Sequence, residues 1–280
     1  MKTASKFSSL FLHLLAFKYL FPLLLCLVLG ACGSEQQETI IIAGSTSVQP
    51  YAEILAEEFC DLYPDLLIDV QGGGSSAGIT AAANGTAQIG MSSRALKASE
   101  EGFWWVEIAR DGLALIVNPA NTITDLTLEQ VAAIYSGGIT DWSALGCNPH
   151  AIHVITREEG SGTRSAFEEL VMADSLITPK ALVQDSNGTV RQLVANNPHA
   201  IGFISLGLVD DTVKALCLEG IEATVANVSS GSYGLYRPFL FVAEATPQGA
   251  ALLYIDFVLS AVGQQQLRSE GLIPVREVAP

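Results

Sequence analysis

The feature that most constrains the fold is a recurring order of apolar strand, polar turn and helix. An apolar run at residues 39–43 precedes the turn 44–47 (Gly-Ser-Thr-Ser) and a helical pattern over 48–63. A second strand at 66–70 is followed by a glycine-rich turn and a helix over 77–84. This alternation is typical of a parallel sheet covered by crossover helices. In such sheets, ligands bind at the carboxyl ends of the strands.

The same alternation continues along the chain. Short apolar runs predict further strands, and longer segments with helical spacing predict the helices between them. The alternation fits two α/β lobes better than one sheet. The predicted strands are 87–91, 113–119, 152–156, 200–204 and 240–242, and the predicted helices are 126–135, 163–172, 190–196 and 250–260.

The first 31 residues have the features of an export signal. Three lysines are the only charged residues before Cys32, and the apolar run 19–31 is about 13 residues long, short of the roughly 20 that span a bilayer. The run ends in Leu-Gly-Ala-Cys, which resembles a bacterial lipobox, whose cysteine is acylated. We predict a signal peptide at 1–31, a lipid on Cys32 that holds the protein on a membrane, and a polar tether at 32–37. An ordinary signal peptide or an uncleaved anchor is the alternative.

The charge balance excludes one class of partner. The chain has 14 basic and 29 acidic residues, a formal charge of −15. Removal of residues 1–31 takes three lysines and no acidic residue, so the mature chain carries −18. Nonspecific nucleic-acid binding needs a basic surface, and we expect none here. An anionic ligand stays compatible, because charges are screened beyond about 8 Å at physiological salt and local donors decide.

The cysteines leave one question open. Beyond Cys26, which is removed, and Cys32, three thiols remain, so at least one is free. Cys60 falls in a helical pattern and is expected to be buried. Disulfides can form outside the cytoplasm, and a bridge between Cys147 and Cys217 is one alternative.

Three strand-to-helix turns carry small hydroxyl residues, at 45–47, 75–76 and 161–163. The first turn of a helix presents unpaired N–H groups and the positive end of the helix dipole, and a glycine there lets a ligand approach closely. Such turns bind anions, although N-capping alone explains any single one. Arg94 and Arg157 stand at strand ends, where each can offer paired hydrogen bonds to an oxyanion. Surface salt bridges are the alternative role for these arginines.

These turns belong to longer segments that resemble the phosphate-binding lipoproteins of bacterial ABC importers. The segments keep their order and extend over nearly the whole mature chain. They are residues 44–50, 72–78, 89–94, 157–164, 200–207, 237–241, 255–260 and 271–275.

The resemblance implies a type II periplasmic-binding-protein fold. Each of two α/β lobes would hold a mainly parallel sheet flanked by helices, with the ligand in the cleft between them and a hinge motion that closes it. One lobe would contain 38–113 and 237–280, and the other 114–236. The family captures inorganic phosphate for an ABC permease. We therefore expect an extracytoplasmic, lipid-anchored monomer at the periplasmic face or cell surface, with no catalytic activity, cofactor or metal.

The same resemblance assigns site residues. Glu159 falls where the family often has an acid that pairs with the arginine. Ser93 stands where the best-known branch has an aspartate, which accepts a hydrogen bond from protonated phosphate. A carboxylate only accepts hydrogen bonds, whereas serine also donates them, so rejection of sulfate would fall to a group such as Glu158 or Glu159. The expected phosphate-binding residues are Thr46, Ser47, Ser75, Ser93, Arg94, Arg157, Ser161, Gly162 and Thr163.

Other functions remain open at this point. The protein could bind another tetrahedral oxyanion, such as sulfate, molybdate or tungstate. It could also sense phosphate without a transporter. The last alternative is hydrolysis, because residues 74–78 match the Gly-x-Ser-x-Gly nucleophile elbow, with Ser76 as nucleophile. A hydrolase also needs a histidine, and none of the candidates lies in a convincing late loop: His150, His153 and His199.

A metal site is a further alternative. Cys147, His150 and His153 are spaced by three residues, a spacing found among metal ligands. A zinc site needs at least three well-placed ligands, and these residues lie in a loop that runs into a strand beside Pro149. A surface loop is the simpler interpretation.

Overall fold

The computed structural model describes residues 37–276 of the chain. The predicted signal peptide, the lipidation site Cys32 and all of the tether except Gln37 lie outside the described residues. Residues 39–276 form one compact unit. Within residues 37–276, no helix combines the length and the apolar character that crossing a bilayer requires.

Among the described residues, the main sheet has ten strands, and eight of them form a hydrogen-bonded path in the order β2-β1-β3-β11-β4-β8-β6-β7. Strands β9 (Lys214–Ala215) and β12 (Ile273–Pro274) pair with β4 off this path, and β5 (Asp125–Leu126) pairs with β10 (Cys217–Leu218) in a separate small sheet. Most of the predicted strands are confirmed within one or two residues. The eight strands are β1 (Glu38–Gly44), β2 (Leu66–Gly72), β3 (Ile89–Ser92), β4 (Trp104–Val117), β6 (His153–Arg157), β7 (Leu182–Gln184), β8 (Ala200–Ser205) and β11 (Tyr236–Ala243).

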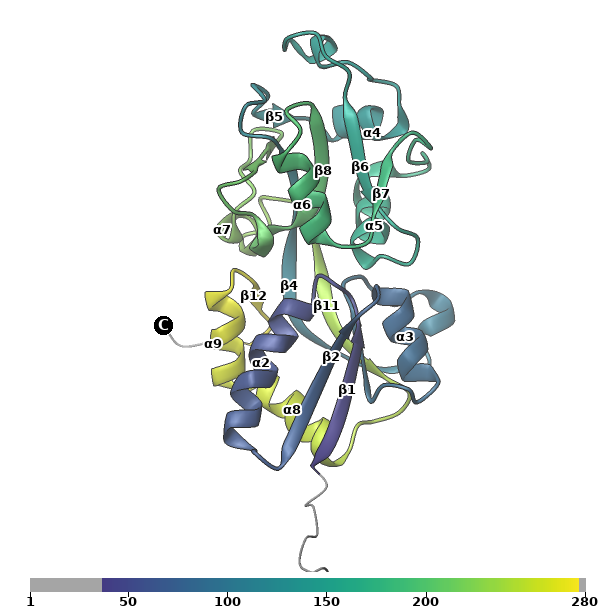
Figure 1. Ribbon diagram of the computed structural model, residues 1–280, viewed down its shortest axis with the longest axis vertical. Helices are drawn as coiled ribbons and strands as arrows, with labels where there is room; N and C mark the ends of the chain where they lie inside the picture. The colour runs from purple at the N-terminus through teal and green to yellow at the C-terminus, as the bar shows by residue number, and fades with distance from the viewer. Residues whose placement is uncertain (1–36, 277–280) are drawn as a thin grey trace, which may run out of the picture. The chain divides into compact units, whose positions relative to one another are not determined.

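Strand β4 joins two sheet regions. Strands β1 and β3 are parallel, as are β6 with β7 and β8, while β11 runs antiparallel to β3 and β4, and β4 runs antiparallel to β8. The first part of β4 pairs with β11 and its last part with β8. The sequence predicted only this last part, because Glu107, Arg110 and Asp111 interrupt the apolar pattern before it. Two sheet regions thus share one long strand (Figure 1).

Helices cover the sheet, and capping fixes several of their starts. Helix α4 begins after Thr127, whose hydroxyl accepts the Gln130 N–H, and α6 begins after Ser186 in the same way. Helix α3 begins two residues earlier than predicted, and the predicted helix 163–172 divides into α5 and a π-helical turn. The helices are α2 (Gln49–Leu62), α3 (Ser75–Ala83), α4 (Leu128–Ser136), α5 (Gly162–Phe167), α6 (Asn187–Ala195), α7 (Val225–Ser229), α8 (Gly249–Val258) and α9 (Ala261–Ser269).

The apolar side chains gather in separate cores. One core combines side chains from before residue 110 with others from after 238, such as Phe59 and Tyr254, whose rings meet edge to face at 5.3 Å. Two further clusters use only residues 113–235, where Phe167 stacks on Phe203 at 4.1 Å. Figure 1 shows β4 and β11 running between the two groups of elements. Each group thus has its own core, and the long strands β4 and β11 run between the two.

The three thiols in the described residues are unpaired. Cys60, Cys147 and Cys217 are all free and half-buried. The alternative of a bridge between Cys147 and Cys217 is therefore wrong in this structure. Cys60, in the last turn of α2, packs against the first core, and part of its surface stays accessible.

Candidate anion-binding site

Two of the predicted turns, 45–47 and 75–76, meet the segment after β3, which holds Ser93, at the carboxyl ends of β1 and β3. Because these strands are parallel neighbours, the segments that follow them leave the sheet at the same edge. Ser45 Oγ donates to Ser93 Oγ at 2.8 Å, and the Ser93 N–H donates to Ser75 Oγ at 3.0 Å. The hydroxyls of Ser75 and Ser93 lie 3.3 Å apart. All three side chains are buried, so this group of hydroxyls is withdrawn from solvent.

The third predicted turn, before α5, reaches this group from the other core. The Ser47 and Thr163 hydroxyl oxygens are 2.8 Å apart, and the Ser76 N–H donates to the Gly160 carbonyl at 3.1 Å. A Cβ added at Gly162 would overlap the Ser75 hydroxyl, so only a glycine allows this approach. The structure therefore brings together residues that are 116 positions apart in sequence. Here "hydroxyl cluster" means Ser45, Ser47, Ser75, Ser93 and Thr163.

Arg157 lies beside this cluster and is almost fully buried. Its Nη2 donates to Thr46 Oγ1 at 3.0 Å, and Glu158 accepts from both Nε and Nη2 at 2.9 Å. The expected partner, Glu159, is the wrong acid: Glu158 lies against the guanidinium, whereas Glu159 is exposed in the turn that follows. Among the described residues, Arg157 Nη1 has no hydrogen-bond partner although it is buried. A buried cationic N–H without an acceptor is favourable for an anion.

Ser161 and Arg94 have more local partners. Ser161 Oγ accepts the Arg164 N–H at 3.3 Å, which makes it the N-cap of α5. Arg94 donates to both carboxylate oxygens of Glu100, at 2.7 and 2.9 Å, and to Ser76 Oγ at 3.3 Å. The charge of Arg94 is thus already paired within its own loop.

The Arg94–Glu100 pair makes stability depend on pH. The hydrogen bond from Arg94 holds the pKa of Glu100 below its ordinary value, with a smaller contribution from the Lys97 N–H. A carboxyl with a lowered folded-state pKa stabilises the fold above its unfolded pKa and stops doing so as pH falls through the folded pKa. We expect the free energy of unfolding to fall more steeply below about pH 5 in the parent than in Glu100→Gln. Urea unfolding curves at several pH values measure the free energy of unfolding. The same dependence on pH in the parent and in Glu100→Gln would contradict the expectation.

Four contributing residues were absent from the predicted set. Ser45 belongs to the first turn, but the resemblance does not assign it a role. Asn187 donates to Ser47 Oγ at 2.8 Å, and Arg237 donates to the same atom at 3.1 Å. Asp111 pairs with Arg237 at 3.0 Å, with both side chains buried. Ser45 and Arg237 carried a sequence signal, because both lie in segments similar to the family, whereas Asn187 and Asp111 carried none.

The nucleophile elbow lacks the partners of a hydrolase. Within residues 37–276, the Ser76 hydroxyl accepts a hydrogen bond from the Arg94 side chain. The guanidinium is only a donor and cannot act as the general base of a hydrolase. The rings of His150 and His199 instead stack on each other at 4.0 Å, beside the first residue of strand β8. Ser205, at the other end of this strand, is the residue that contacts Asn187. The structure therefore gives the hydrolase alternative no support.

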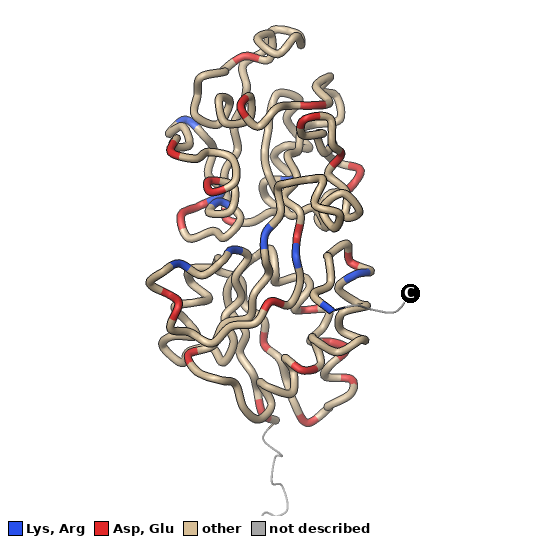
Figure 2. The backbone as a smooth tube through the Cα atoms, turned by 180° about the vertical axis from the view of Figure 1, so that it is seen from behind, with Lys and Arg blue, Asp and Glu red and all other residues tan. Residues whose placement is uncertain are grey.

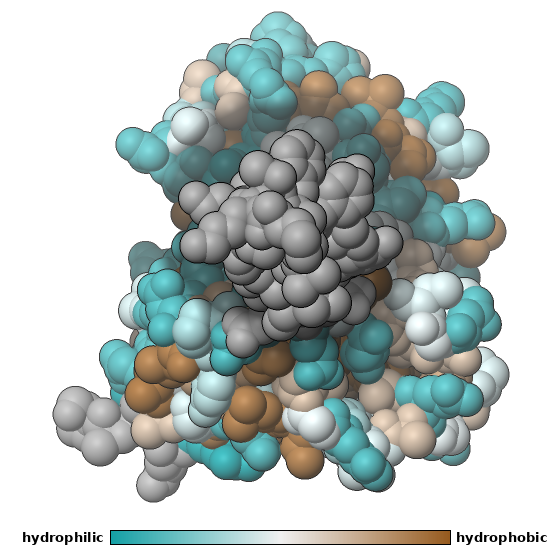
Figure 3. Space-filling model, turned by 60° about the horizontal axis from the view of Figure 1, so that its bottom comes forward, coloured by the Kyte–Doolittle hydropathy of each residue, from teal (hydrophilic) through white to brown (hydrophobic). Residues whose placement is uncertain are grey.

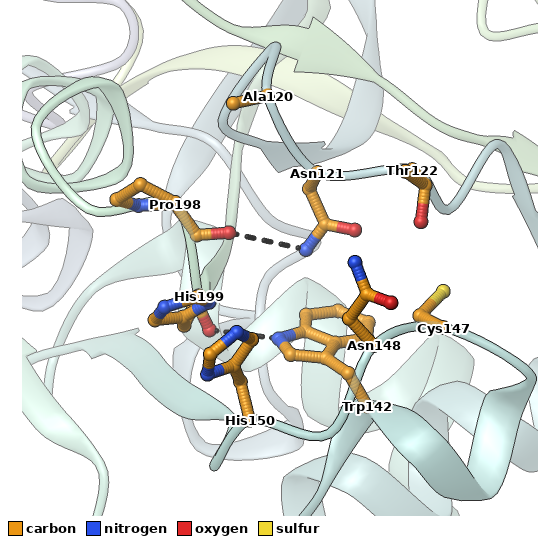
Figure 4. Close-up of a pocket in the computed structure, with 9 residues that line it drawn as sticks. All are labelled: Ala120, Asn121, Thr122, Trp142, Cys147, Asn148, His150, Pro198 and His199. Carbon is orange, nitrogen blue, oxygen red and sulfur yellow. Dashed lines mark hydrogen bonds between the residues drawn. The ribbon is translucent and has the colours of Figure 1, made fainter.

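The structure contradicts the metal alternative. Cys147 and His150 line a cavity of about 170 Å³ together with Trp142 and His199 (Figure 4), whereas His153 lines a different one. In the part of the chain that the structure describes, no three His, Cys, Asp or Glu side chains are placed to hold a metal ion. The rings of His150 and His153 both lie near that of His199, at 4.0 and 6.4 Å between centroids, which is ring packing rather than the placement of metal ligands.

The chain is similar to known proteins in both sequence and fold. Residues 30–262 match the family model of the PBP superfamily domain. The chain is 31% identical over 258 residues to the phosphate-binding protein PstS of Bacillus subtilis, covering 89% of this chain and 85% of that protein.

Solved structures agree with the sequence relatives. A phosphate ABC transporter substrate-binding protein with bound phosphate from Clostridium perfringens is 44% identical, with a TM-score of 0.83 over 85% of this chain and 100% of that one. An ABC-type phosphate transport receptor from Vibrio cholerae is 40% identical, with a TM-score of 0.71 over 84% and 99%. The chain belongs to the PBP superfamily and, within it, to the family of the PstS phosphate-binding proteins.

Proposed function

We propose that this protein captures inorganic phosphate outside the cytoplasm and delivers it to an ABC permease without catalysing a reaction. The observation that carries the proposal is the hydroxyl cluster, buried beside Arg157, whose Nη1 has no acceptor among the described residues. Hydrogen bonds to an anion are strong in such a water-poor site. The Clostridium perfringens relative, which is named for its bound phosphate, supports the same ligand.

The ligand would lie between two lobes, 38–113 with 237–280 and 114–236. Serine and threonine hydroxyls would donate to its oxygens, and Gly162 would let the α5 backbone approach. Arg157 would supply a direct charge, whereas Arg94 would act from behind the α3 turn, because Glu100 holds its guanidinium. The proposed ligand set is Thr46, Ser47, Ser75, Ser93, Arg94, Arg157, Ser161, Gly162 and Thr163.

Phosphate binding depends most directly on Arg157. We expect Arg157→Ala to weaken phosphate binding by at least about 1.5 kcal/mol, roughly tenfold, the scale of a hydrogen bond to a charged group. Isothermal titration calorimetry with inorganic phosphate on the purified mature domain measures the effect. Arg110→Ala is the matched control, because Arg110 is 55% exposed and pairs with Glu107 at the surface. A dissociation constant that Arg157→Ala leaves unchanged would sink the proposed site.

The identity of the anion needs its own experiment. No carboxylate belongs to the proposed ligand set, and Glu158 is already paired with Arg157. Titration with phosphate in the presence of excess sulfate, molybdate or tungstate separates the candidates. Little competition supports a phosphate-binding protein. Displacement by one of the other anions at low concentration would assign that anion instead.

The location proposed for the protein rests on the N-terminal sequence. Acylation of Cys32 would hold the domain on the membrane, and mass analysis of the mature N-terminus tests the acylation. We expect the anchored domain to be a monomer. Acidic residues spread over both groups of elements, while several of the few basic residues lie near the middle, around β4 and β11 (Figure 2). On the visible part of the face drawn in Figure 3, apolar side chains form small groups among hydrophilic ones.

A further inference from the structure

The Ser47 hydroxyl has three hydrogen-bond partners from three different segments. Asn187 Nδ2 at the start of α6 lies 2.8 Å from Ser47 Oγ, and Arg237 Nη2 on β11 lies 3.1 Å from it. Thr163 Oγ1 on α5 lies 2.8 Å away. Ser47, Asn187 and Thr163 are each 1% exposed and Arg237 is 2% exposed, so water does not compete with these partners.

These partners determine where the Ser47 proton points. A hydroxyl has one proton to donate and two lone pairs that accept. The Arg237 guanidinium can only donate. The Asn187 amide is oriented by its other end, because Asn187 Oδ1 accepts the Ser205 N–H at 3.3 Å, so its NH₂ faces Ser47. Both lone pairs of Ser47 are therefore occupied, and its proton must go to the third neighbour, which here is Thr163 Oγ1.

The arrangement behind Ser47 prevents an easy exchange of these roles. Asp111 accepts from Arg237 Nε at 3.2 Å and from Nη2 at 3.0 Å, and its other oxygen accepts the Ser205 hydroxyl at 2.8 Å. Asp111 and Arg237 are also register partners on β4 and β11. Ser205 thus contacts both Asp111 and Asn187, which links the two donors into one buried network.

We propose that Asn187 and Arg237 are positioning residues that make Ser47 an obligate hydrogen-bond donor toward the bound anion. The inference rests on the proposed phosphate site. A serine hydroxyl alone is ambivalent and can accept from a protonated anion oxygen. With both lone pairs occupied, Ser47 is complementary only to an unprotonated oxygen. The site thereby gains a directed donor at the position where the two cores meet.

A double-mutant cycle with inorganic phosphate tests this role. Asn187→Asp keeps the shape and the acceptor for Ser205, but removes the donor and offers Ser47 an acceptor that competes with phosphate. We expect Ser47→Ala to weaken phosphate binding about tenfold in the parent and less than about twofold in the Asn187→Asp background. The cycle removes the direct effect of the new charge, because that charge is present in both members of the second pair.

Each outcome is distinguishable. Equal losses from Ser47→Ala in both backgrounds would overturn the positioning role, whereas absence of phosphate binding in the parent would overturn the proposed function itself. Asn118→Leu is the control, because Asn118 is a buried amide that bonds only to the backbone: it donates to the carbonyls of Val194 and Ala195 and accepts the Ala120 N–H. Its loss should lower the melting temperature without changing phosphate affinity. If Asn187→Asp does not fold, Asn187→Leu removes the same donor without added charge and enters the same cycle under the same criterion.

Discussion

Replacement of Asp111 by alanine is expected to destabilise the protein by about 3–5 kcal/mol, because it leaves Arg237 charged and buried without its carboxylate. Both side chains of this pair are at most 1% exposed, and their closest N–O distance is 3.0 Å. Burial raises the pKa of Asp111 and lowers that of Arg237, and each charge offsets this effect on its partner. The pair therefore depends on both members.

The measurement is the free energy of unfolding from urea curves, with unchanged slope as the check that unfolding stays two-state. Glu107→Gln is the matched control, since it breaks an ion pair whose arginine is 55% exposed and should cost less than about 1 kcal/mol. A second comparison separates loss of a pair from loss of one partner. Asp111→Leu combined with Arg237→Met should recover part of the lost stability, because no unpaired charge remains. A small effect of Asp111→Ala would mean that water reaches Arg237.

The convergence of the turns was predictable because strand periodicity is a local signal. Residues 39–43, 66–70 and 87–91 read as strands of one parallel sheet, and parallel strands bring the turns after them to one edge. Ser75 and Ser93 therefore could be placed near Ser45–Ser47 without a structure. That Thr163 reaches the same place depends on the arrangement of two cores, and here the family resemblance, rather than periodicity, supplied the expectation.

The sequence did not predict which charged residues form ion pairs with each other. Asp111 and Arg237 are separated by 126 positions, and nothing local indicates that two charged residues in strands are buried together. Arg94 is the opposite case, since its partner Glu100 is only six residues away. Its charge was nevertheless assigned to the ligand, because a loop conformation decides whether such neighbours meet. The choice between Glu158 and Glu159 depended on the turn after β6 in the same way.

The expectation with the largest effect on binding concerns Gly162. Gly162→Ala should weaken phosphate binding by about 3 kcal/mol, more than a hundredfold, because overpacking of a close contact costs on this scale. A Cβ at this position would overlap the hydroxyls of Ser75 and Ser93, which come from the other core. Gly162 has ordinary backbone angles at the start of α5, so alanine should not disturb the helix itself.

Calorimetry with inorganic phosphate and a melting curve on the same sample distinguish a local clash from misfolding. Gly188→Ala is the matched control at the first turn of α6, where the nearest atom to the new Cβ is Ser186 Oγ at 3.9 Å. Its phosphate affinity should equal that of the parent. If Gly162→Ala binds phosphate normally, the α5 turn does not approach the hydroxyls of the other core in the bound protein. In that case Ser75 and Ser93 cannot share one ligand with Thr163, since the same approach brings all three hydroxyls together.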